Sequence, residues 1–182
     1  MNIKLGNLEI LPVQEHPELM AKPVAYLVLS LPNNQEIGIT KIDSNLSDTA
    51  NFCEHYKITP EEAANCVVIE TKSGGERKLA AIVILSSTRA DVNGVVCDTL
   101  GVKKASFAQM EKAVRESGME YGAITPVGLP SEWPILVDKA AADAKLVVMG
   151  SGIRGSKLVI HGSFLASLPN ARVVEGLANP RS

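Results

Sequence analysis

The sequence predicts a mixed α/β protein with a largely antiparallel sheet. Short apolar runs alternate with turn residues, and two pairs of these runs lie close enough in the chain to form hairpins. Segments with helix-capping residues are interspersed among the runs, and this mixture is typical of the α/β classes. The 182 residues contain no repeat, low-complexity stretch or linker, so we expect a single domain spanning residues 1–182.

The first third of the chain is predicted to contain one hairpin and two helices. Val24 to Leu31 and Glu36 to Ile42 are apolar runs separated by a turn, so they are expected to pair as strands. A helix is expected from near Ser47 to near Tyr56. A second, short helix is predicted to begin at Thr59-Pro60-Glu61-Glu62, which combines a capping box with a proline in the first turn.

A second hairpin is predicted in the middle of the chain. Its strands are Cys66 to Glu70 and Lys78 to Ser86, which is the most apolar run, and a Gly-Gly turn joins them. After it, Asp91 is expected to cap a helix that stops at Gly101, because glycine favours the left-handed conformation at a helix end.

The next helix is predicted to begin with Ser106 as its cap and to end at Gly118. Its helical spacing gives a buried stripe of Phe107, Met110 and Val114. The remaining predicted elements are the strands Ile135–Asp138, Leu146–Met149 and Lys157–Ile160 and a short helix from Ser163 to Leu168.

The segment from Ser117 to Pro134 is the least regular part of the chain. It holds three glycines, three prolines and the chain's single tryptophan. Glycine frees the backbone and proline fixes it, so their alternation specifies an unusual path. Its apolar content argues against disorder. We expect a fixed loop that lines a site, with Ile124, Val127, Leu129 and Trp133 as candidate walls; the alternative is a packed structural crossover.

Composition and charge exclude several classes of function. The chain is 46% hydrophobic and 21% charged, which is ordinary for a soluble globular protein. A net charge of −2 provides no field for holding long stretches of nucleic acid, so DNA is not an expected partner, although a local basic patch could bind one nucleic-acid end. No apolar run is long enough to span a membrane and the N-terminus has no signal-like region, so we expect a cytoplasmic protein with no membrane partner.

The cysteine and histidine residues do not form a metal or disulfide pattern. Three cysteines are an odd number with wide spacing, and the three histidines lie far apart in the sequence. Cys66 and His161 are expected to be structural rather than catalytic. Asp91 and Asp138 have the positions of helix caps or turn residues. We therefore expect neither a metal nor an organic cofactor.

A glycine-rich turn, Gly150-Ser151-Gly152-Ile153-Arg154-Gly155, has the spacing G-x-G-x-x-G. A dinucleotide site requires a helix to begin there, whereas the next residues have the pattern of a strand. The pattern is still compatible with a single phosphate held by backbone N–H groups. The alternative is a tight connection between neighbouring strands.

Several blocks, in this order, resemble a known family. They are Thr59 to Val68, Leu79 to Leu85, Leu100 to Ala105, Gly122 to Gly128 and Gly152 to Gly155. Together they resemble the YbaK-like aminoacyl-tRNA editing domains, the free-standing relatives of the editing insertion in bacterial prolyl-tRNA synthetase. The resemblance covers residues 45–175, and residues 1–44, with the predicted hairpin, look like an N-terminal extension.

The resemblance implies a mixed α/β fold around a six- or seven-stranded, mainly antiparallel sheet. It also implies hydrolysis of the ester that joins a wrong amino acid to the terminal adenosine of a tRNA. Gly122, Ala123, Ile124, Thr125 and Pro126 look like the family's G-x-x-x-P loop, whose backbone positions the ester while the tRNA's own 2′-hydroxyl assists. Such a site is consistent with a chain that has no Ser-His pair, because backbone N–H groups can stabilise an oxyanion.

The chain departs from the family at a charged position. Active members commonly carry a lysine at the start of the strand after the short capped segment, and Asn65 stands there in this sequence. An acidic residue that some relatives carry after the glycine-rich turn is Lys157 here. On this alignment Ser151, Gly152 and Arg154 form the phosphate side of the site, and Lys157 or Arg154 is a candidate for the missing positive charge.

The sequence therefore predicts a trans-acting aminoacyl-tRNA deacylase. The expected partners are the acceptor end of an aminoacyl-tRNA and, as a second candidate, an aminoacyl-tRNA synthetase. Two alternatives remain at this point. A catalytically weakened relative would bind tRNA ends or a synthetase, and a third class would hydrolyse or bind a small amino-acid derivative.

Overall fold

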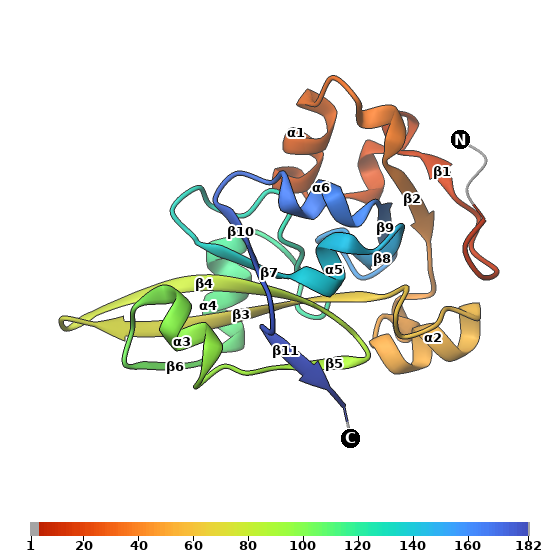
Figure 1. Cartoon of the computed structure of the whole chain (residues 1–182). Helices are drawn as coiled ribbons and strands as arrows, with labels where there is room; N and C mark the ends of the chain where they lie inside the picture. Colours follow the sequence, from red (N-terminus) through yellow and green to blue (C-terminus); the bar gives the residue numbers. More distant parts are fainter. Residues whose placement is uncertain (1–3, 182) are drawn as a thin grey trace.

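Two sheets and a short ribbon make up the β-structure of the computed structural model, which describes residues 4–181 (Figure 1). The four-stranded sheet has the order β1-β2-β9-β8 and is antiparallel throughout. The five-stranded sheet has the order β10-β7-β4-β3-β6, in which β7 runs parallel to both β4 and β10 and the other pairs are antiparallel. The mixed α/β class is confirmed.

The strands of the first sheet are β1 (Leu11–Pro12), β2 (Gly38–Lys41), β8 (Val147–Gly150) and β9 (Ser156–Ile160). Those of the second are β3 (Ala64–Ser73), β4 (Glu76–Leu85), β6 (Lys104–Phe107), β7 (Ile135–Asp138) and β10 (Ala171–Val174). The ribbon pairs β5 (Thr88–Ala90) with β11 (Ala178–Pro180).

The two sheets meet where β3 begins. Ala63 forms a parallel bridge with Val148, and the Val148 N–H donates to the carbonyl of Glu62 at 2.8 Å. The first residues of β3 therefore lie beside β8, whereas residues 69–72 pair with β6. This change of neighbour along one strand positions the site described below.

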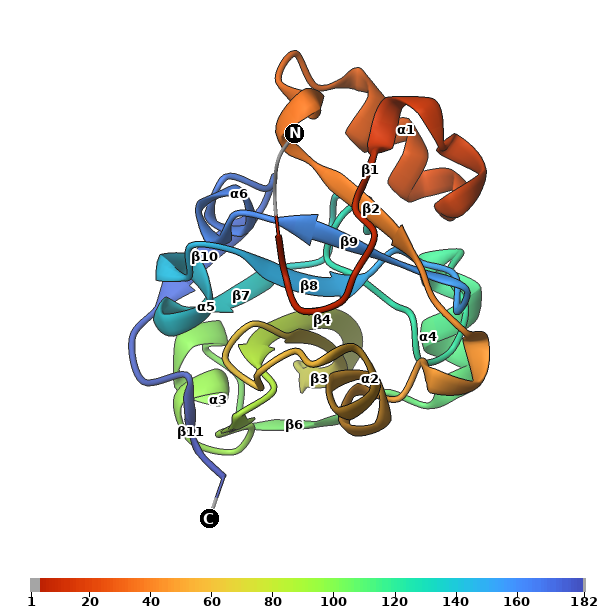
Figure 2. The same ribbon diagram turned by 90° about the vertical axis from the view of Figure 1, so that its right-hand side faces the viewer.

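Six helices surround the sheets in residues 4–181 (Figures 1 and 2). They are α1 (Lys22–Ser30), α2 (Thr49–Tyr56), α3 (Val95–Leu100), α4 (Met110–Ser117), α5 (Lys139–Asp143) and α6 (Gly162–Ala166). Short 3₁₀ turns occupy Val13–Glu15, Pro17–Leu19, Asn34–Glu36 and Ser44–Leu46. Figure 1 shows α1 above the four-stranded sheet and α3 below β4, with α4 behind the β3–β4 hairpin.

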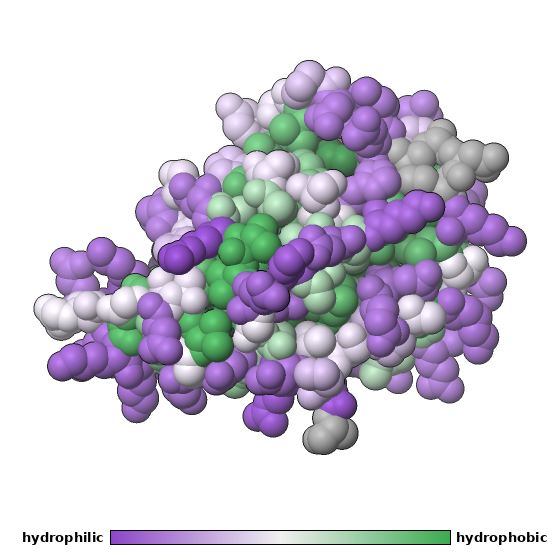
Figure 3. All heavy atoms as spheres, viewed as in Figure 1, coloured by the Kyte–Doolittle hydropathy of each residue, from purple (hydrophilic) through white to green (hydrophobic). Residues whose placement is uncertain are grey.

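Strand β4 is buried on both faces. Ala81, Val83 and Leu85 contact the main core between the sheets, and the alternate residues, such as Ile82, contact the second core around α3 and β11. A strand has a side-chain period of two, so a continuous apolar run is what burial on both faces requires. Figure 3 shows the outside of this region, where hydrophobic residues gather over β7, β10 and α3 among hydrophilic ones.

The predicted N-terminal hairpin is wrong, because residues 24–30 belong to helix α1. Pro23 lies in the first turn of α1, where a missing N–H costs nothing. Val24 and Val28, four residues apart, are fully buried, while Tyr26 between them is exposed. Tertiary packing of this helical face overrides the strand preference of the apolar run. Strand β2 does form within the predicted run 36–42, but it pairs with β1 and β9.

The short helix predicted at Thr59 is also wrong. The capping-box contacts are present, since the Glu62 carboxylate accepts from the N–H and the hydroxyl of Thr59 at 2.9 and 3.0 Å. They close a single turn, however, because β3 begins only two residues later at Ala64. A capping pattern fixes where a turn starts and does not determine how many residues follow it.

The helix predicted from Ser106 begins later, at Met110, and buries a different face. Ser106 and Phe107 belong to strand β6. The buried residues of α4 are Ala113 and Ser117, whereas the side chains of Phe107 and Met110 are exposed. The prediction that Phe107 and Met110 are buried is therefore wrong. The exposed Phe107 side chain is available for another role.

The other predicted elements are confirmed with small shifts of their ends: the second hairpin, the helices ending at Tyr56 and Gly101, strands β7, β8 and β9, and helix α6. Asp138 caps α5 by accepting the Ala140 N–H at 3.3 Å. Strands β1, β5, β6, β10 and β11 and helix α5 were not predicted. The expected division of the chain near residue 44 stays a prediction.

Candidate active site

A cavity of about 630 Å³ lies where the two sheets meet. Its walls come from the start of β3, the loop before Ile124, the end of β8, strand β9 and the N-terminus of α2, and β6 and α4 line the remaining side. Segments that are far apart in the sequence thus converge here. The cavity lies at the point along β3 where the neighbouring strand changes from β8 to β6.

The cavity brings together half of the site residues predicted from the sequence. Asn65, Gly122, Ile124, Arg154 and Lys157 all line it. The other predicted residues lie behind the wall or away from it: Ala123, Thr125 and Ser151 are buried, Gly152 packs against Ala21, and Pro126 lines a separate surface pocket beside Pro23. Of the candidate loop walls, Ile124 lines the cavity, Val127 and Trp133 belong to the core, and Leu129 lines the pocket beside Pro23.

The irregular loop and the glycine-rich turn form one hydrogen-bonded unit. The Glu120 N–H donates to the Gly152 carbonyl at 2.8 Å, and the Gly152 N–H donates to the Ala123 carbonyl at 2.9 Å. The Glu120 carboxylate accepts the Arg154 N–H at 2.7 Å. The turn connects two antiparallel strands and no helix begins there, so its G-x-G-x-x-G spacing does not form a dinucleotide site.

Gly150 lets the loop approach the end of β8. A Cβ atom built at Gly150 would lie 2.3 Å from the carbonyl oxygen of Ala123. This contact is with backbone, which cannot rotate away as the end of a side chain could. Glycine is therefore required here by the close approach of two backbones.

Two backbone N–H groups of the loop are free at the cavity wall. Among the hydrogen bonds within residues 4–181, none uses the N–H of Gly122 or Ile124 as a donor. Gly122 has a φ of 80°, in the left-handed region that glycine tolerates. Gly122 is exposed and Ile124 is half-buried, so both N–H groups are accessible to a partner that enters the cavity. They are suited to an oxygen that gains negative charge during a reaction.

Asn65 is oriented by α2. The Thr49 hydroxyl donates to the Asn65 Oδ1 at 2.8 Å. This bond fixes the side-chain amide, because a hydroxyl that donates must face the oxygen rather than the nitrogen. Neither proton of the Asn65 amide nitrogen is used in the hydrogen bonds of the described residues, so Asn65 offers a neutral donor to the cavity.

Lys157 brings a buried positive charge to the same cavity. Its side chain is 7% exposed, and its Nζ donates to the Ser47 carbonyl at 3.4 Å and lies 4.8 Å from the centre of the Phe52 ring. Burial lowers the pKa of Lys157 to about 8, while Cys53 and Asp48 act in the opposite direction. Lys157 therefore gains or loses its charge near physiological pH.

The cavity is basic although the whole chain is weakly acidic. Arg154, Lys157 and Arg181 line it, and none of them belongs to an ion pair with a carboxylate in residues 4–181. Asp48 is the acidic residue among the lining side chains, and its carboxylate accepts the N–H groups of Ala50 and Asn51 as the cap of α2. Such a site favours an anionic ligand.

Sequence reasoning missed the segment that holds the two polar side chains in place. Ser47 contacts Lys157 and Thr49 contacts Asn65, so residues 47–49 position both. In the sequence this segment has only the pattern of a helix start. Cys66 also lines the cavity, and burial raises the pKa of its thiol to about 12, which keeps it protonated.

Clustered metal ligands and membrane-spanning helices are both absent from the described chain. Between residues 4 and 181, no three His, Cys, Asp or Glu side chains gather closely enough to hold a metal ion. None of the helices in that range has the length and apolar character needed to cross a bilayer.

Solved structures share this fold at low sequence identity. One, described as "a putative trans-editing enzyme for prolyl tRNA synthetase", superposes with a TM-score of 0.72 at 15% identity, covering 85% of this chain and 94% of that one. A hypothetical protein, APE2540, gives a TM-score of 0.68 at 19% identity and covers 78% and 90% of the two chains. These similarities define the fold class.

The sequence defines the family. The family model described as "Aminoacyl-tRNA editing domain" matches residues 43–168, which is more than half of the chain. The protein belongs to the aminoacyl-tRNA editing domain family.

Proposed function

We propose that this protein is a trans-acting deacylase that hydrolyses the ester of a mischarged tRNA. The observation that carries the proposal is the convergence of Asn65, the N–H groups of Gly122 and Ile124, and the cations Arg154 and Lys157 on one cavity. An aminoacyl-tRNA end offers a matching set of groups, namely an ester carbonyl and nearby phosphates.

The free N–H groups act on the ester carbonyl. When water attacks the carbonyl carbon, negative charge develops on the carbonyl oxygen, and hydrogen bonds from Gly122 and Ile124 stabilise it. The bond between the carbonyl carbon and the ribose oxygen then breaks, and that oxygen takes up a proton. The products are the free amino acid and a tRNA with its hydroxyl restored. The vicinal ribose hydroxyl of the tRNA is the expected assisting group, since no histidine lines the cavity.

The cations act on the nucleotide. We infer that the positive charge that active relatives carry at the position of Asn65 is supplied here from β9 by Lys157. Asn65 and Lys157 line one cavity, and the single segment 47–49 contacts both. Arg154 is held at the rim, where its Nη2 donates to the Ser44 carbonyl at 3.2 Å. A phosphate that enters between these groups would meet two positive charges and one neutral donor.

A second candidate function is binding of the tRNA end without hydrolysis. The neutral Asn65 at the family's lysine position favours it. In that case Lys157 and Arg154 would still hold the nucleotide, but the ester would not be activated. A synthetase as partner stays a prediction in either case.

The first experiment is incubation with a panel of tRNAs, each charged with a wrong small amino acid. We expect at least one to lose its amino acid faster than in a control without enzyme. If none does, the deacylase proposal fails, and a gel shift with uncharged tRNA that weakens as salt rises would support the second candidate. If the protein neither deacylates a charged tRNA nor binds an uncharged one, small amino-acid derivatives are the class of ligand to screen.

A second expected result concerns the hydroxyl that orients Asn65. Thr49→Val is expected to lower deacylation about fivefold, because the hydrogen bond to Oδ1 is worth about 1 kcal/mol and the amide turns when it is lost. Thr49→Ser keeps the hydroxyl and serves as the matched control, with activity close to wild type. Equal activity of the two variants, measured as kcat/KM on the same mischarged tRNA, would show that the Asn65 orientation does not matter.

A further inference from the structure

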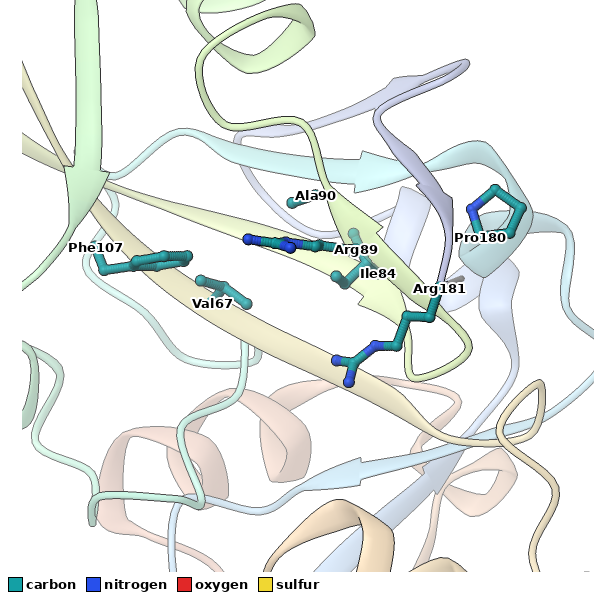
Figure 4. A pocket seen from close by; sticks show the side chains of 7 residues that line it. All are labelled: Val67, Ile84, Arg89, Ala90, Phe107, Pro180 and Arg181. Atoms are coloured by element: carbon teal, nitrogen blue, oxygen red, sulfur yellow. The ribbon is translucent and has the colours of Figure 1, made fainter.

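A second pocket of about 520 Å³ adjoins the main cavity (Figure 4). The two share four lining residues, Val67, Ile84, Phe107 and Arg181, so they form one continuous groove along the sheet. The second pocket adds Arg89, Ala90 and Pro180 from the β5–β11 ribbon. It therefore extends the main cavity toward the C-terminal strand.

Phe107 is an exposed aromatic ring in this groove. Its side chain is 69% exposed, although a phenylalanine on a sheet is usually buried. In Figure 4 the ring lies beside Val67, and the guanidinium of Arg89 points toward the same place. An open aromatic face next to a cation is a surface on which a base can stack.

Two arginines line the same pocket. Arg89 lies opposite Asn179 in the ribbon, and Arg181 follows directly after β11. The Arg181 Nε donates to the Thr88 carbonyl at 3.0 Å, which fixes its direction. Neither arginine is paired with a carboxylate among residues 4–181. Unpaired guanidinium groups bind phosphate well because they present several donors in one plane.

We propose that this second pocket binds the single-stranded nucleotides that precede the terminal adenosine of the tRNA, with a base stacked on Phe107 and phosphates held by Arg89 and Arg181. The inference rests on the proposed function, since it places the terminal nucleotide in the main cavity. Aromatic faces combined with unpaired cations are the recognition chemistry of single-stranded nucleic acid. The β5–β11 ribbon depends on residues 178–180, which lie beyond the family match ending at residue 168.

The continuity of the two pockets supports this occupant over an unrelated ligand. A strand that leaves the main cavity past Val67 enters the second pocket directly. Together the groove presents Arg89, Arg154, Lys157 and Arg181 on a protein whose net charge is −2. This is a local field for a short polyanion rather than for a long duplex.

Binding of labelled RNA to the full chain tests the proposal without requiring hydrolysis. One probe is a short RNA hairpin ending in the single-stranded C-C-A of a tRNA, and the other is the same hairpin with a blunt end. Fluorescence anisotropy should show at least tenfold tighter binding of the first probe. Arg89→Gln should weaken that binding and reduce the slope of log K against log salt by about 1. Phe107→Leu should weaken it about tenfold with the slope unchanged.

Lys145→Gln is the matched control. Lys145 is exposed, carries the same charge as Arg89 and precedes β8 at the end opposite Gly150, which lines the cavity. The Lys145→Gln variant should bind the hairpin with the C-C-A end as tightly as wild type does. Both test residues are exposed, so circular dichroism and thermal unfolding should match wild type as well.

Hydrolysis separates a failure of this inference from a failure of the deacylase proposal. If the protein deacylates tRNA, both variants should raise KM for the mischarged tRNA. Arg89→Gln, at a residue that lines the second pocket and not the main cavity, should leave hydrolysis of a 3′-aminoacyl adenosine unchanged. Variants that bind and hydrolyse like wild type would overturn the pocket assignment alone. Equal wild-type binding of the two probes would overturn it too. Loss of binding in the variants of a protein that never hydrolyses would support the pocket and reject the deacylase.

Discussion

Lys157→Met is expected to lower kcat/KM for a mischarged tRNA about hundredfold. The substitution keeps an unbranched apolar side chain in the buried position beside Phe52 and removes the charge that the cavity offers to the nucleotide. A charge-assisted hydrogen bond in a site of low dielectric contributes about 1.5–3 kcal/mol, and a factor of one hundred corresponds to about 2.7 kcal/mol. Steady-state deacylation at pH 7 measures the loss.

The same variant should be more stable than wild type at pH 7. The pKa of Lys157 is about 8 in the folded protein, whereas the unfolded chain has the ordinary lysine value of 10.5, so burial of the charge costs the fold about 3 kcal/mol. Between pH 8 and 10.5 the unfolded chain binds the extra proton, and wild-type stability therefore rises with pH in this window. After loss of the Ser47 contact is included, urea unfolding should show a gain of about 2 kcal/mol below pH 8 that disappears toward pH 10.5.

The double variant Asn65→Lys, Lys157→Met tests whether the positive charge can enter from either strand. It restores a lysine at the family's usual position and removes the one on β9, so at least a tenfold recovery over Lys157→Met is expected. Asn65→Lys alone should lower activity, because it places two ammonium groups in one cavity and lowers the pKa of Lys157 further. A gain of activity in that single variant would instead indicate a site disabled by Asn65.

Gly150→Ala is expected to reduce deacylation at least hundredfold. The added methyl group would lie 2.3 Å from the Ala123 carbonyl oxygen, so the loop must move away from the end of β8. Displacement by about 1 Å is sufficient to misplace the N–H groups of Gly122 and Ile124 relative to the ester. The free energy of unfolding should fall by about 1–3 kcal/mol because of overpacking.

Gly155→Ala is the control for Gly150→Ala. It adds the same methyl group to the same turn, but no atom lies within 4 Å of the new Cβ position, and the backbone there does not have a positive φ. Wild-type kcat/KM and thermal stability are expected. If Gly150→Ala unfolds at the same temperature as Gly155→Ala and retains activity, the loop does not position the ester.

The sequence predicted the strands that are apolar on both faces and the caps with a local mechanism. Strand β4 and the glycine that ends α3 are examples, because continuous burial and a left-handed residue both leave a direct mark on the sequence. Residues 24–31 show the limit. Their apolar residues allow either period, and only packing against the main core selects the helix.

The part of the site that could be predicted from the sequence is the part that the order of the blocks shared with the family identifies. The order of blocks brought Asn65 and the 122–126 loop into consideration, and the structure places Asn65, Gly122 and Ile124 at one cavity. Local pattern could not separate Gly122, which lines the cavity, from Thr125, which is buried behind it. Arg89 could not have been foreseen, because pairing of the β5–β11 ribbon is a long-range event. Phe107 was missed because it was assigned to a buried helical stripe, whereas it ends strand β6, which pairs with β3.

The change of neighbours along β3 has a consequence for the size of the substrate. Residues 64–67 lie between the bridge to β8 at Ala63 and the first bond to the β6 side at Val68, so one edge of this strand is open along the cavity. The cavity thus occupies the place of an absent strand. Neighbouring strands are spaced about 4.8 Å apart, and that spacing is set by backbone bonds rather than by side chains. The width of this part of the cavity is therefore set by the backbone of the sheet, and surface substitutions should alter it little.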